Sequence, residues 1–313
     1  MQETQVVVIG CGFMGCDIAA IFLKAGWQVQ AVEATISAHE GARQRMQSST
    51  ESLGGVWNPD QLKLHTSLES IDWKGVRLVV ETVTENLAVK QEVFRTLDTC
   101  VPAEIPIGSN SSGFRITDIA EGCQTAERMA NAHFFLPAHT VPLVELAKGE
   151  RTSDACLDAL QRAFEEVGRA VVRIQKDLPG FLANRMQHAL MREAFSILDA
   201  GLATPEDVDK AVRYGFGFRY ASAGPMLQKE FAGLDTQLVA ATSIYPSLCN
   251  DPNPPKILTD LVAQGRTGTR ALKGFWNWTP EELAAERARY ESVLSEVSDI
   301  IARNPSALPK DSA

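Results

Sequence analysis

A histidine and a glutamate in the middle of the chain have the residue types of an acid–base pair. His133 lies at the end of a predicted strand, and Glu145 follows twelve residues later between two apolar pairs, Leu143-Val144 and Leu146-Ala147. A carboxylate inside such a strand needs a partner. If neighbouring strands bring them together, Glu145 would hold the imidazole of His133 in one tautomer and stabilise its protonated form, which makes a base usable near neutral pH. The spacing equally allows two residues that are satisfied separately by backbone or solvent.

Three further polar features accompany apolar elements. Ser109-Asn110-Ser111-Ser112-Gly113 follows a predicted strand, where parallel sheets bind ligands, although such a cluster is more often a turn or a helix cap. Asn184 projects from the otherwise apolar face of a predicted helix, where pairing within the core is the commoner role and a ligand contact the alternative. His139 is expected to be an exposed loop residue, because no third ligand at metal-binding spacing accompanies it.

A glycine-rich turn supplies the clearest binding signal. The segment Gly10-Cys11-Gly12-Phe13-Met14-Gly15 has the pattern Gly-x-Gly-x-x-Gly between a β-branched run and an apolar-faced helical stretch. Gly10 permits the tight turn, Gly12 lets a pyrophosphate approach the backbone, and Gly15 allows close packing of helix on strand. We therefore predict a dinucleotide site.

Glu33 ends the second predicted strand, about 20 residues beyond the glycines, where an acid reads the adenosine ribose. It can accept hydrogen bonds from both ribose hydroxyls but would repel a 2′-phosphate, and no arginine follows immediately. The sequence thus favours NAD over NADP. A solvated acid at a strand end is the alternative interpretation.

Alternating β-branched runs and amphipathic stretches in the first half predict the elements that position these residues. Such alternation is typical of an α/β domain with a parallel, Rossmann-type sheet. The predicted strands are Gln5–Ile9, Gln28–Glu33, Arg77–Glu81, Ile105–Ser109, Met129–Phe134, Val141–Ala147 and Ala170–Ile174.

A Pro-Gly break at Lys176–Gly180 marks the change to a second, all-α domain. Beyond it the strand signals largely cease, and Thr204-Pro205-Glu206-Asp207 has the cap, proline and acidic turn of a helix start. We predict an NAD-binding domain over residues 1–178 and a helical substrate and dimerisation domain over 179–313.

Composition restricts the possible partners. The 313 residues carry a net charge of −9 without a lysine- or arginine-rich run, so nucleic acid is not expected as a partner. We expect no membrane association and a cytoplasmic location, because no signal peptide or long apolar run is present and the six cysteines are scattered. No metal is predicted. The apolar helix faces of the second domain exceed what it can bury alone, which predicts a homodimer.

At this point the sequence resembles the 3-hydroxyacyl-CoA dehydrogenase family along almost the whole chain. The segments that carry the resemblance are Val8–Gly15, Val80–Asn86 with Lys90, Ser109–Ser112, Ala132–Phe135 with Leu143–Glu145, Pro179–Arg185, and Gly265-Arg266 through Gly274-Phe275-Trp276.

The resemblance implies a role for each candidate residue. His133 would be the general base and Glu145 its orienting partner, while Ser112 and Asn184 would hydrogen-bond the reacting oxygen. Glu85 and Lys90 would lie along the NAD. The predicted coenzyme-binding set is Gly10, Gly12, Phe13, Met14, Gly15, Glu33, Glu85, Lys90 and Asn110.

Departures from the family pattern concern the substrate. Leu136 stands where the family usually has asparagine, Pro142 where acyl-CoA enzymes commonly have lysine, and Ala271-Leu272 where a small residue and glycine are usual. The segment Gly215–Pro225 is similar to its counterpart in gulonate and carnitine dehydrogenases, and its Arg219 is an arginine that acyl-CoA enzymes usually lack. Arg219 could bind a substrate carboxylate through two parallel hydrogen bonds, or it could brace its loop against helix carbonyls.

The leading hypothesis is an NAD-dependent oxidoreductase that acts on a 3-hydroxy acid, with a slight preference for a small free acid. The alternative is an L-3-hydroxyacyl-CoA dehydrogenase with a role in fatty acid metabolism. A third possibility is a catalytically silent NAD-binding protein, as a lens crystallin related to this family illustrates.

Overall fold

The computed structural model describes residues 4–178 and 180–305 as two compact units, which divide between Asn184 and Arg185. Pro179, within the predicted break, lies outside the described residues, and the predicted domain boundary beside it stays a prediction. None of the helices in the described ranges has the length and apolarity needed to span a membrane.

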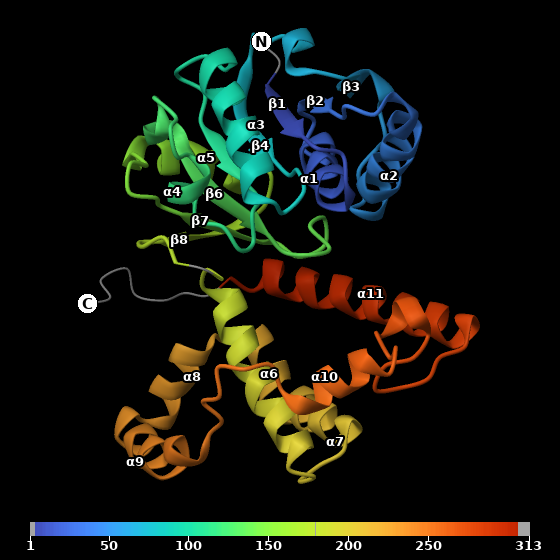
Figure 1. The fold of residues 1–313 in the computed structure, drawn as a ribbon, viewed down its shortest axis with the longest axis vertical. Helices are drawn as coiled ribbons and strands as arrows, with labels where there is room; N and C mark the ends of the chain where they lie inside the picture. The colour runs from blue at the N-terminus through green and yellow to red at the C-terminus, as the bar shows by residue number, and fades with distance from the viewer. Residues whose placement is uncertain (1–3, 179, 306–313) are drawn as a thin grey trace. The chain divides into compact units, whose positions relative to one another are not determined.

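An eight-stranded sheet forms the centre of the first unit (Figure 1). Its order is β3-β2-β1-β4-β5-β6-β7-β8, and neighbouring strands run parallel except that β7 is antiparallel to β6. The strands are β1 Gln5–Ile9, β2 Gln28–Val32, β3 Leu62–His65, β4 Val76–Glu81, β5 Ile107–Ser109, β6 Met129–Phe134, β7 Leu143–Ala147 and β8 Ala170–Ile174. The predicted fold class is confirmed, with the correction that the sheet is mixed rather than wholly parallel.

Helices cover both faces of this sheet because buried residues alternate along its strands. Val6 and Val8 pack with α1, α2 and α5, whereas Val7 and Ile9 pack with α3 and α4. The helices are α1 Phe13–Lys24, α2 His39–Ser52, α3 Leu87–Cys100, α4 Ile116–Ile119 and α5 Asp154–Glu166, and short 3₁₀ turns lie at Ile36–Ala38, Pro59–Gln61, Leu68–Ser70 and Ala126–Arg128. Among the strands of this sheet, the four-residue edge strand β3 was the one not predicted, because its short, half-exposed run Leu-Lys-Leu-His lacks a continuous apolar pattern.

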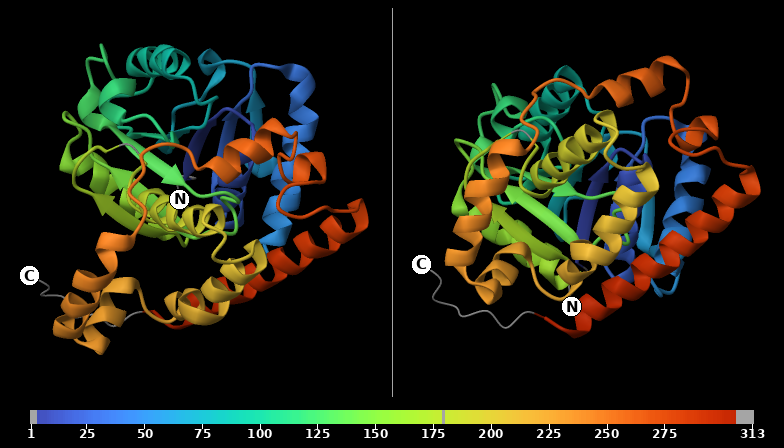
Figure 2. Two further views of the ribbon diagram at one scale, coloured as in Figure 1. Left: turned by 60° about the horizontal axis from the view of Figure 1, so that its bottom comes forward. Right: turned by 90° about the horizontal axis from the view of Figure 1, so that it is seen from below.

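The second unit is built of helices (Figure 2). The predicted start at Thr204 is confirmed, since its side chain accepts a hydrogen bond from the Asp207 amide and Pro205 takes the first helical position. The helices are α6 Ala183–Asp199, α7 Pro205–Lys210, α8 Pro225–Ala232, α9 Leu234–Ile244, α10 Lys256–Ala263 and α11 Pro280–Arg303, with a π-helical segment at Ala211–Gly217 and 3₁₀ turns at Phe218–Ala221, Tyr245–Ser247 and Thr269–Ala271. The first two residues of α6 belong to the first compact unit.

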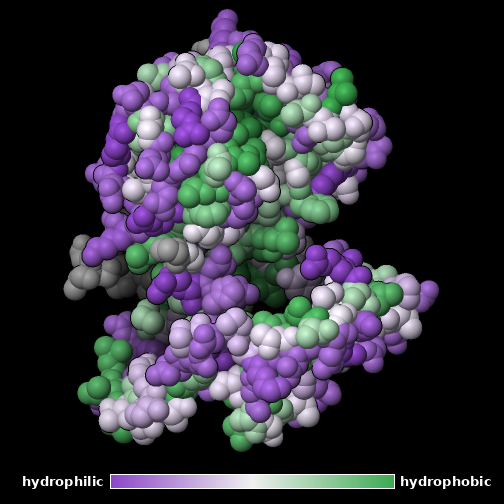
Figure 3. All heavy atoms as spheres, in the orientation of Figure 1, coloured by the Kyte–Doolittle hydropathy of each residue, from purple (hydrophilic) through white to green (hydrophobic). Residues whose placement is uncertain are grey.

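Few apolar side chains of the second unit are buried. Ala194 is its one buried hydrophobic residue within the described part of the chain. Large exposed hydrophobic side chains on α8 and α9 include Met226, Phe231, Leu234, Leu238, Val239 and Ile244. Hydrophobic atoms are visible over these two helices in Figure 3. This unit therefore exposes to water an apolar surface of the kind that usually packs against another protein.

Candidate active site

The antiparallel pairing of β6 with β7 places His133 directly opposite Glu145. His133 Nδ1 lies 3.0 Å from Glu145 Oε2, and His133 Nε2 lies 3.0 Å from the Ser112 hydroxyl oxygen. A carboxylate only accepts hydrogen bonds, so Nδ1 carries the proton and Nε2 is free to accept from the Ser112 hydroxyl. The side chains of His133 and Glu145 are only 3% and 0% exposed. The structure thus selects the paired arrangement that the sequence left open.

Glu145 is itself fixed by the chain that enters α6. Its other oxygen, Oε1, accepts hydrogen bonds from the amides of Leu182 (3.0 Å) and Ala183 (2.7 Å) at the start of the helix. A carboxylate is favoured there by the free amides and the helix dipole. Phe181 packs its ring against His133, with ring centroids 5.1 Å apart. These contacts hold the glutamate rigidly behind the imidazole.

Asn184 is the next residue of α6, half-buried in its first turn. Within the described part of the chain its side chain makes no hydrogen bond to Ser112, His133 or Glu145. The structure therefore brings three of the four predicted catalytic residues together. The side-chain amide of Asn184 is not hydrogen-bonded to those three residues.

Glu85 organises the loop that carries Ser112. Its Oε1 accepts hydrogen bonds from the Ser111 hydroxyl (2.7 Å) and from the amides of Ser112 (3.1 Å) and Gly113 (2.8 Å). Burial alone would raise the pKa of the Glu85 carboxyl, but these hydrogen bonds and the Lys90 ammonium outweigh it and lower that pKa. Glu85 thus shapes the serine loop, and its predicted contact with the coenzyme stays a prediction.

Lys90 is a buried cation, with only 1% of its side chain exposed. Its ammonium lies 2.8 Å from Glu81 Oε1, donates to the Val83 carbonyl at 3.2 Å and lies 3.5 Å from Glu85 Oε2. The sequence analysis missed Glu81, which also accepts from the Ser109 hydroxyl and is the last residue of the apolar strand β4. An acid that directly follows a run of buried apolar residues is a weaker signal than the one that singled out Glu145, but it could have pointed to Glu81. Because the Lys90 ammonium is surrounded by protein oxygens, its predicted place along the coenzyme remains a prediction.

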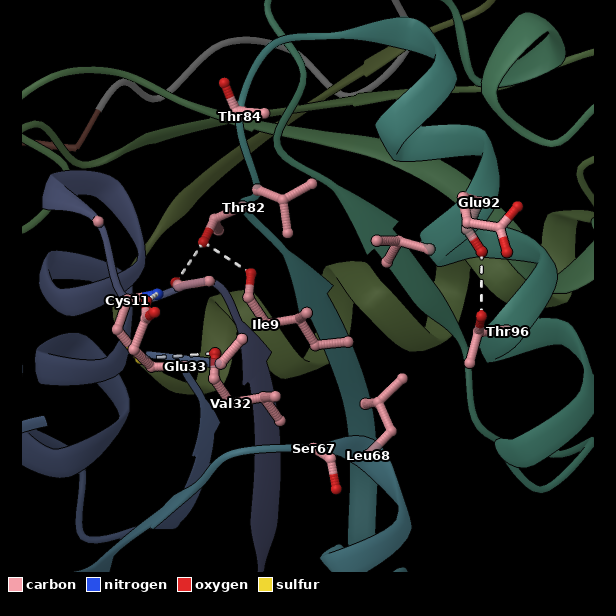
Figure 4. Close-up of a pocket in the computed structure, with 15 residues that line it drawn as sticks. Ile9, Cys11, Val32, Glu33, Ser67, Leu68, Thr82, Thr84, Glu92 and Thr96 are labelled. Atoms are coloured by element: carbon pink, nitrogen blue, oxygen red, sulfur yellow. Dashed lines mark hydrogen bonds between the residues drawn. The ribbon is translucent and has the colours of Figure 1, made fainter. Parts of the chain in front are cut away.

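A cavity of about 600 Å³ opens at the carboxyl ends of β1, β2 and β4 (Figure 4). It is lined by Ile9, Gly10, Cys11, Gly12, Val32, Glu33, Ala34, Ser67, Leu68, Thr82, Val83, Thr84, Glu92, Val93 and Thr96. The apolar members provide a slot for a flat ring, and the glycine turn with the N-terminus of α1 provides amides for an anion. This is the place at which parallel α/β sheets bind dinucleotides.

Two glycines of this turn could be replaced only with strain or a steric clash. Gly10 has φ +90°, which disfavours any side chain. A Cβ on Gly15 would lie 1.9 Å from the Gly10 carbonyl oxygen and 2.6 Å from Thr82 Oγ1, which donates to the Gly10 carbonyl. The helix therefore lies close enough to the strand to direct its first amides at the cavity. Gly12, by contrast, has open space around it, as the approach of a pyrophosphate requires.

Glu33 lies at the mouth of the cavity just after β2. Its Oε1 accepts from the Thr35 amide at 3.0 Å, and its Oε2 lies 3.4 Å from the Cys11 amide (Figure 4). These contacts hold the carboxylate at the cavity wall, where it can accept from ribose hydroxyls. The residues present fit NAD. Of the remaining predicted coenzyme residues, Phe13 is 71% exposed, Met14 is half-buried, and Asn110 holds the end of β6 by accepting from the Phe134 amide.

The six cysteines are free thiols. Burial raises the pKa of Cys11 and of Cys156 to about 12, and that of Cys16 to about 11. These three thiols therefore stay protonated at neutral pH, including Cys11 within the glycine turn and Cys16 directly after it.

One expectation about a histidine is wrong. His139 is not an exposed loop residue: its side chain is 20% exposed, and Nδ1 lies 2.9 Å from Oδ2 of the fully buried Asp17. Sequence reasoning missed Asp17, although an acid among the apolar residues of α1 is a signal that it needs a partner.

Arg219 lies in the second unit, where it lines a cavity of about 920 Å³ together with Phe216, Tyr220, Lys229 and Phe231. Its side chain is exposed, and within the described residues its guanidinium makes no hydrogen bond to a helix carbonyl. The contact expected if Arg219 braced its loop against helix carbonyls is therefore not seen. Binding of a substrate carboxylate by Arg219 stays a prediction.

Comparison with protein families covers both units. The family described as 3-hydroxyacyl-CoA dehydrogenase, NAD binding domain, matches residues 5–178, and its C-terminal domain matches residues 180–278.

Individual relatives cover most of the chain. It is 30% identical over 293 residues to 5-formyl-3-hydroxy-2-methylpyridine 4-carboxylate 5-dehydrogenase of Mesorhizobium japonicum, which spans 91% of this chain and 95% of the relative. It is 32% identical over 234 residues to L-carnitine dehydrogenase of Streptomyces coelicolor, 73% of each chain. A solved structure of a 5-formyl-3-hydroxy-2-methylpyridine 4-carboxylic acid 5-dehydrogenase, described as an NAD+ dependent dismutase, superposes with a TM-score of 0.88 at 28% identity, covering 96% of this chain and 98% of that one.

Proposed function

Because the chain belongs to the 3-hydroxyacyl-CoA dehydrogenase family of NAD-dependent oxidoreductases, we propose that it transfers hydride between NAD and the hydroxyl-bearing carbon of a 3-hydroxy acid. We further propose that a small free acid is its preferred substrate. The hydrogen-bonded row Ser112–His133–Glu145, here called the catalytic row, is the observation that carries the proposal of hydride transfer. It presents an unprotonated imidazole nitrogen beside a hydroxyl.

His133 acts as the base in the oxidising direction. Its Nε2 takes the proton of the substrate hydroxyl, and Ser112, 3.0 Å from that nitrogen, orients the same oxygen. The Glu145 carboxylate stabilises the imidazolium that forms. When bound, NAD would supply the acceptor for the hydride that leaves the same carbon. The substrate loses one proton and one hydride and becomes a ketone.

Asn184 is proposed as the second donor to the reacting oxygen. It directly follows Ala183, whose backbone amide donates a hydrogen bond to Glu145. The backbone beside Asn184 is therefore held by the same carboxylate that orients His133. An amide N–H there would favour the carbonyl oxygen as negative charge develops on it.

The preference for a free acid is supported by the names of two relatives and by Arg219. A pyridine carboxylate dehydrogenase and L-carnitine dehydrogenase align with most of this chain. Arg219 adds a guanidinium that makes no hydrogen bond within the part of the chain the structure describes and that lines a cavity together with aromatic side chains. The alternative, a 3-hydroxyacyl-CoA substrate, is supported by the description of the family. A silent NAD-binding protein is disfavoured by the intact catalytic row.

We also propose that the two predicted domains act as separate bodies and that the helical one joins two copies of the chain. The support is its shortage of buried apolar residues and the exposed side chains of α8 and α9. Covering such a surface is the usual source of stability in a homodimer.

The deciding experiment is a substrate panel monitored by NADH absorbance. Free 3-hydroxy acids, aromatic hydroxymethyl carboxylates and 3-hydroxyacyl-CoA esters of matched chain length are compared at equal concentration. Turnover confined to the CoA esters would replace the free-acid proposal with the alternative. Tight NAD binding without turnover of any of them would favour the silent protein.

A further inference from the structure

Asp17 is a buried charge that the catalytic row does not use. It lies in α1 two residues after Gly15, between the fully buried Cys16 and Ile18, and is itself fully buried. A carboxylate in such surroundings is stable only if charged or hydrogen-bonding groups surround it. Its partners come from two other segments of the chain.

Helix α2 supplies two of these partners. The Ser49 hydroxyl donates to Asp17 Oδ1 at 2.9 Å, and Arg45 Nη2 lies 3.0 Å from the same oxygen. The Arg45 guanidinium also lies over the ring of Phe13, 4.5 Å from its centroid. Phe13 follows Gly12 directly, so this side of the carboxylate is connected to the coenzyme turn.

The third partner is His139, whose Nδ1 lies 2.9 Å from Asp17 Oδ2. Both atoms are buried, and neither has a well-aligned hydrogen-bond partner within the described residues. The contact is therefore mainly electrostatic and is attractive when Nδ1 carries a proton. Asp17 is the charged group that faces His139 Nδ1 among the described residues.

His139 belongs to residues 135–142, here called the β6–β7 loop, which begins directly after the catalytic strand. At the start of the loop the Phe135 ring packs edge-on against His133, with centroids 4.7 Å apart. Ala138 is fully buried, and the His139 carbonyl accepts from Arg169 at 3.4 Å. The loop is thus in contact with the base at one end and with Asp17 farther along.

We propose that Asp17 and His139 are positioning residues that tie the β6–β7 loop to the coenzyme-binding helix and so hold His133 in register with the glycine turn. The inference rests on the proposed dehydrogenase function. Hydride transfer requires the base and the coenzyme site to be aligned within a fraction of an ångström, and a displacement of about 1 Å can cost on the order of 100-fold in rate.

The test compares three variants with wild type. His139→Ala removes the imidazole, His139→Asn replaces Nδ1 with an amide nitrogen at a similar place, and Ser49→Ala removes a different partner of the same carboxylate without touching the loop. We expect His139→Ala to lower kcat about 10- to 100-fold while the Kd for NAD changes less than about threefold. His139→Asn should recover most of kcat, and Ser49→Ala should lower only the melting temperature.

A double-mutant cycle tests whether Asp17 and His139 act through each other. Asp17→Asn and His139→Ala should be strongly non-additive in kcat, whereas Ser49→Ala and His139→Ala should add. If His139→Ala changes only the melting temperature, as Ser49→Ala does, the proposal is overturned.

Hydrogen exchange separates this inference from the proposed function. Amides of residues 135–142 should exchange faster in His139→Ala than in wild type or Ser49→Ala, whether or not a substrate is known. Unchanged exchange overturns the positioning role even if the enzyme is active. Faster exchange in a protein that turns over none of the panel leaves the tie intact and rejects the dehydrogenase proposal alone.

Discussion

His133 and Glu145 face each other across the one antiparallel pair of the described sheet, with Nδ1 and Oε2 3.0 Å apart. This register leaves Nε2 of the histidine directed at Ser112 and able to accept a proton. A single reversal of strand direction thus creates the pairing on which the proposed chemistry depends.

Replacing the base should remove turnover without removing the coenzyme. We expect His133→Ala to lower kcat by on the order of 10²–10⁴, the range for a positioned general base. NAD titration by fluorescence and the melting temperature provide the controls, because His133 lies outside the residues that line the cavity of Figure 4. Unchanged turnover would place the base elsewhere.

Glu33 should determine the choice between NAD and NADP. In Glu33→Ser the hydrogen bonds to the ribose are lost, and we expect the KM for NAD to rise by about 10- to 150-fold, the value of a charge-assisted hydrogen bond. The repulsion of a 2′-phosphate is lost as well, so kcat/KM for NADP should improve relative to NAD. The exposed Glu104→Ser serves as the matched control. Equal efficiency of the two coenzymes in wild type would contradict the assignment.

Glu85 should make stability depend on pH. Its pKa is lower in the folded protein than its ordinary value of 4.5, so the unfolded chain binds its proton more readily. The carboxylate therefore stabilises the fold above about pH 4.5, and this contribution is lost as the pH falls through the lowered pKa. Melting temperatures of Glu85→Gln and wild type should differ at pH 7 and converge in acid, whereas Glu104→Gln should follow wild type throughout. A constant difference would show that the carboxylate charge is not the cause.

The state of association can be measured directly. Light scattering at micromolar concentration should report twice the chain mass of 34.1 kDa. A glutamate in place of the exposed Leu238 of α9 should produce monomers, because it puts a charge into apolar surface that the second copy covers. Val56→Glu, at an exposed apolar residue of the first unit, should leave the dimer intact. A wild-type monomer contradicts the prediction.

Arg219 should affect binding of the acid more than catalysis. Lysine keeps the charge but loses the planar fork, so Arg219→Lys should raise KM for a free hydroxy acid by about 10- to 150-fold with a smaller change in kcat. Arg213→Lys, six residues earlier in the chain, is the matched control. If CoA esters are the better substrates and Arg219→Lys changes neither parameter, the free-acid proposal fails.

Local patterns in the sequence are sufficient to predict much of the fold. β1, β6 and β8 have the predicted bounds, because each is a short apolar run bounded by turn or helix residues. The glycine turn and Glu33 are equally local, since the spacing of glycines, helix and strand end within one βαβ unit defines a dinucleotide site. The NAD coenzyme could be predicted for this reason.

Contacts between distant residues could be decided only by the tertiary structure. The sequence left open whether Glu145 meets His133, because twelve residues allow either a cross-strand pair or two separate side chains, and only the antiparallel direction of β7 brings them together. Asp17 and His139 show the same limit more strongly: they are far apart in the chain, and the sequence placed His139 on the surface. Burial, charge pairing and the direction of a strand depend on how whole elements pack, and no local spacing encodes them.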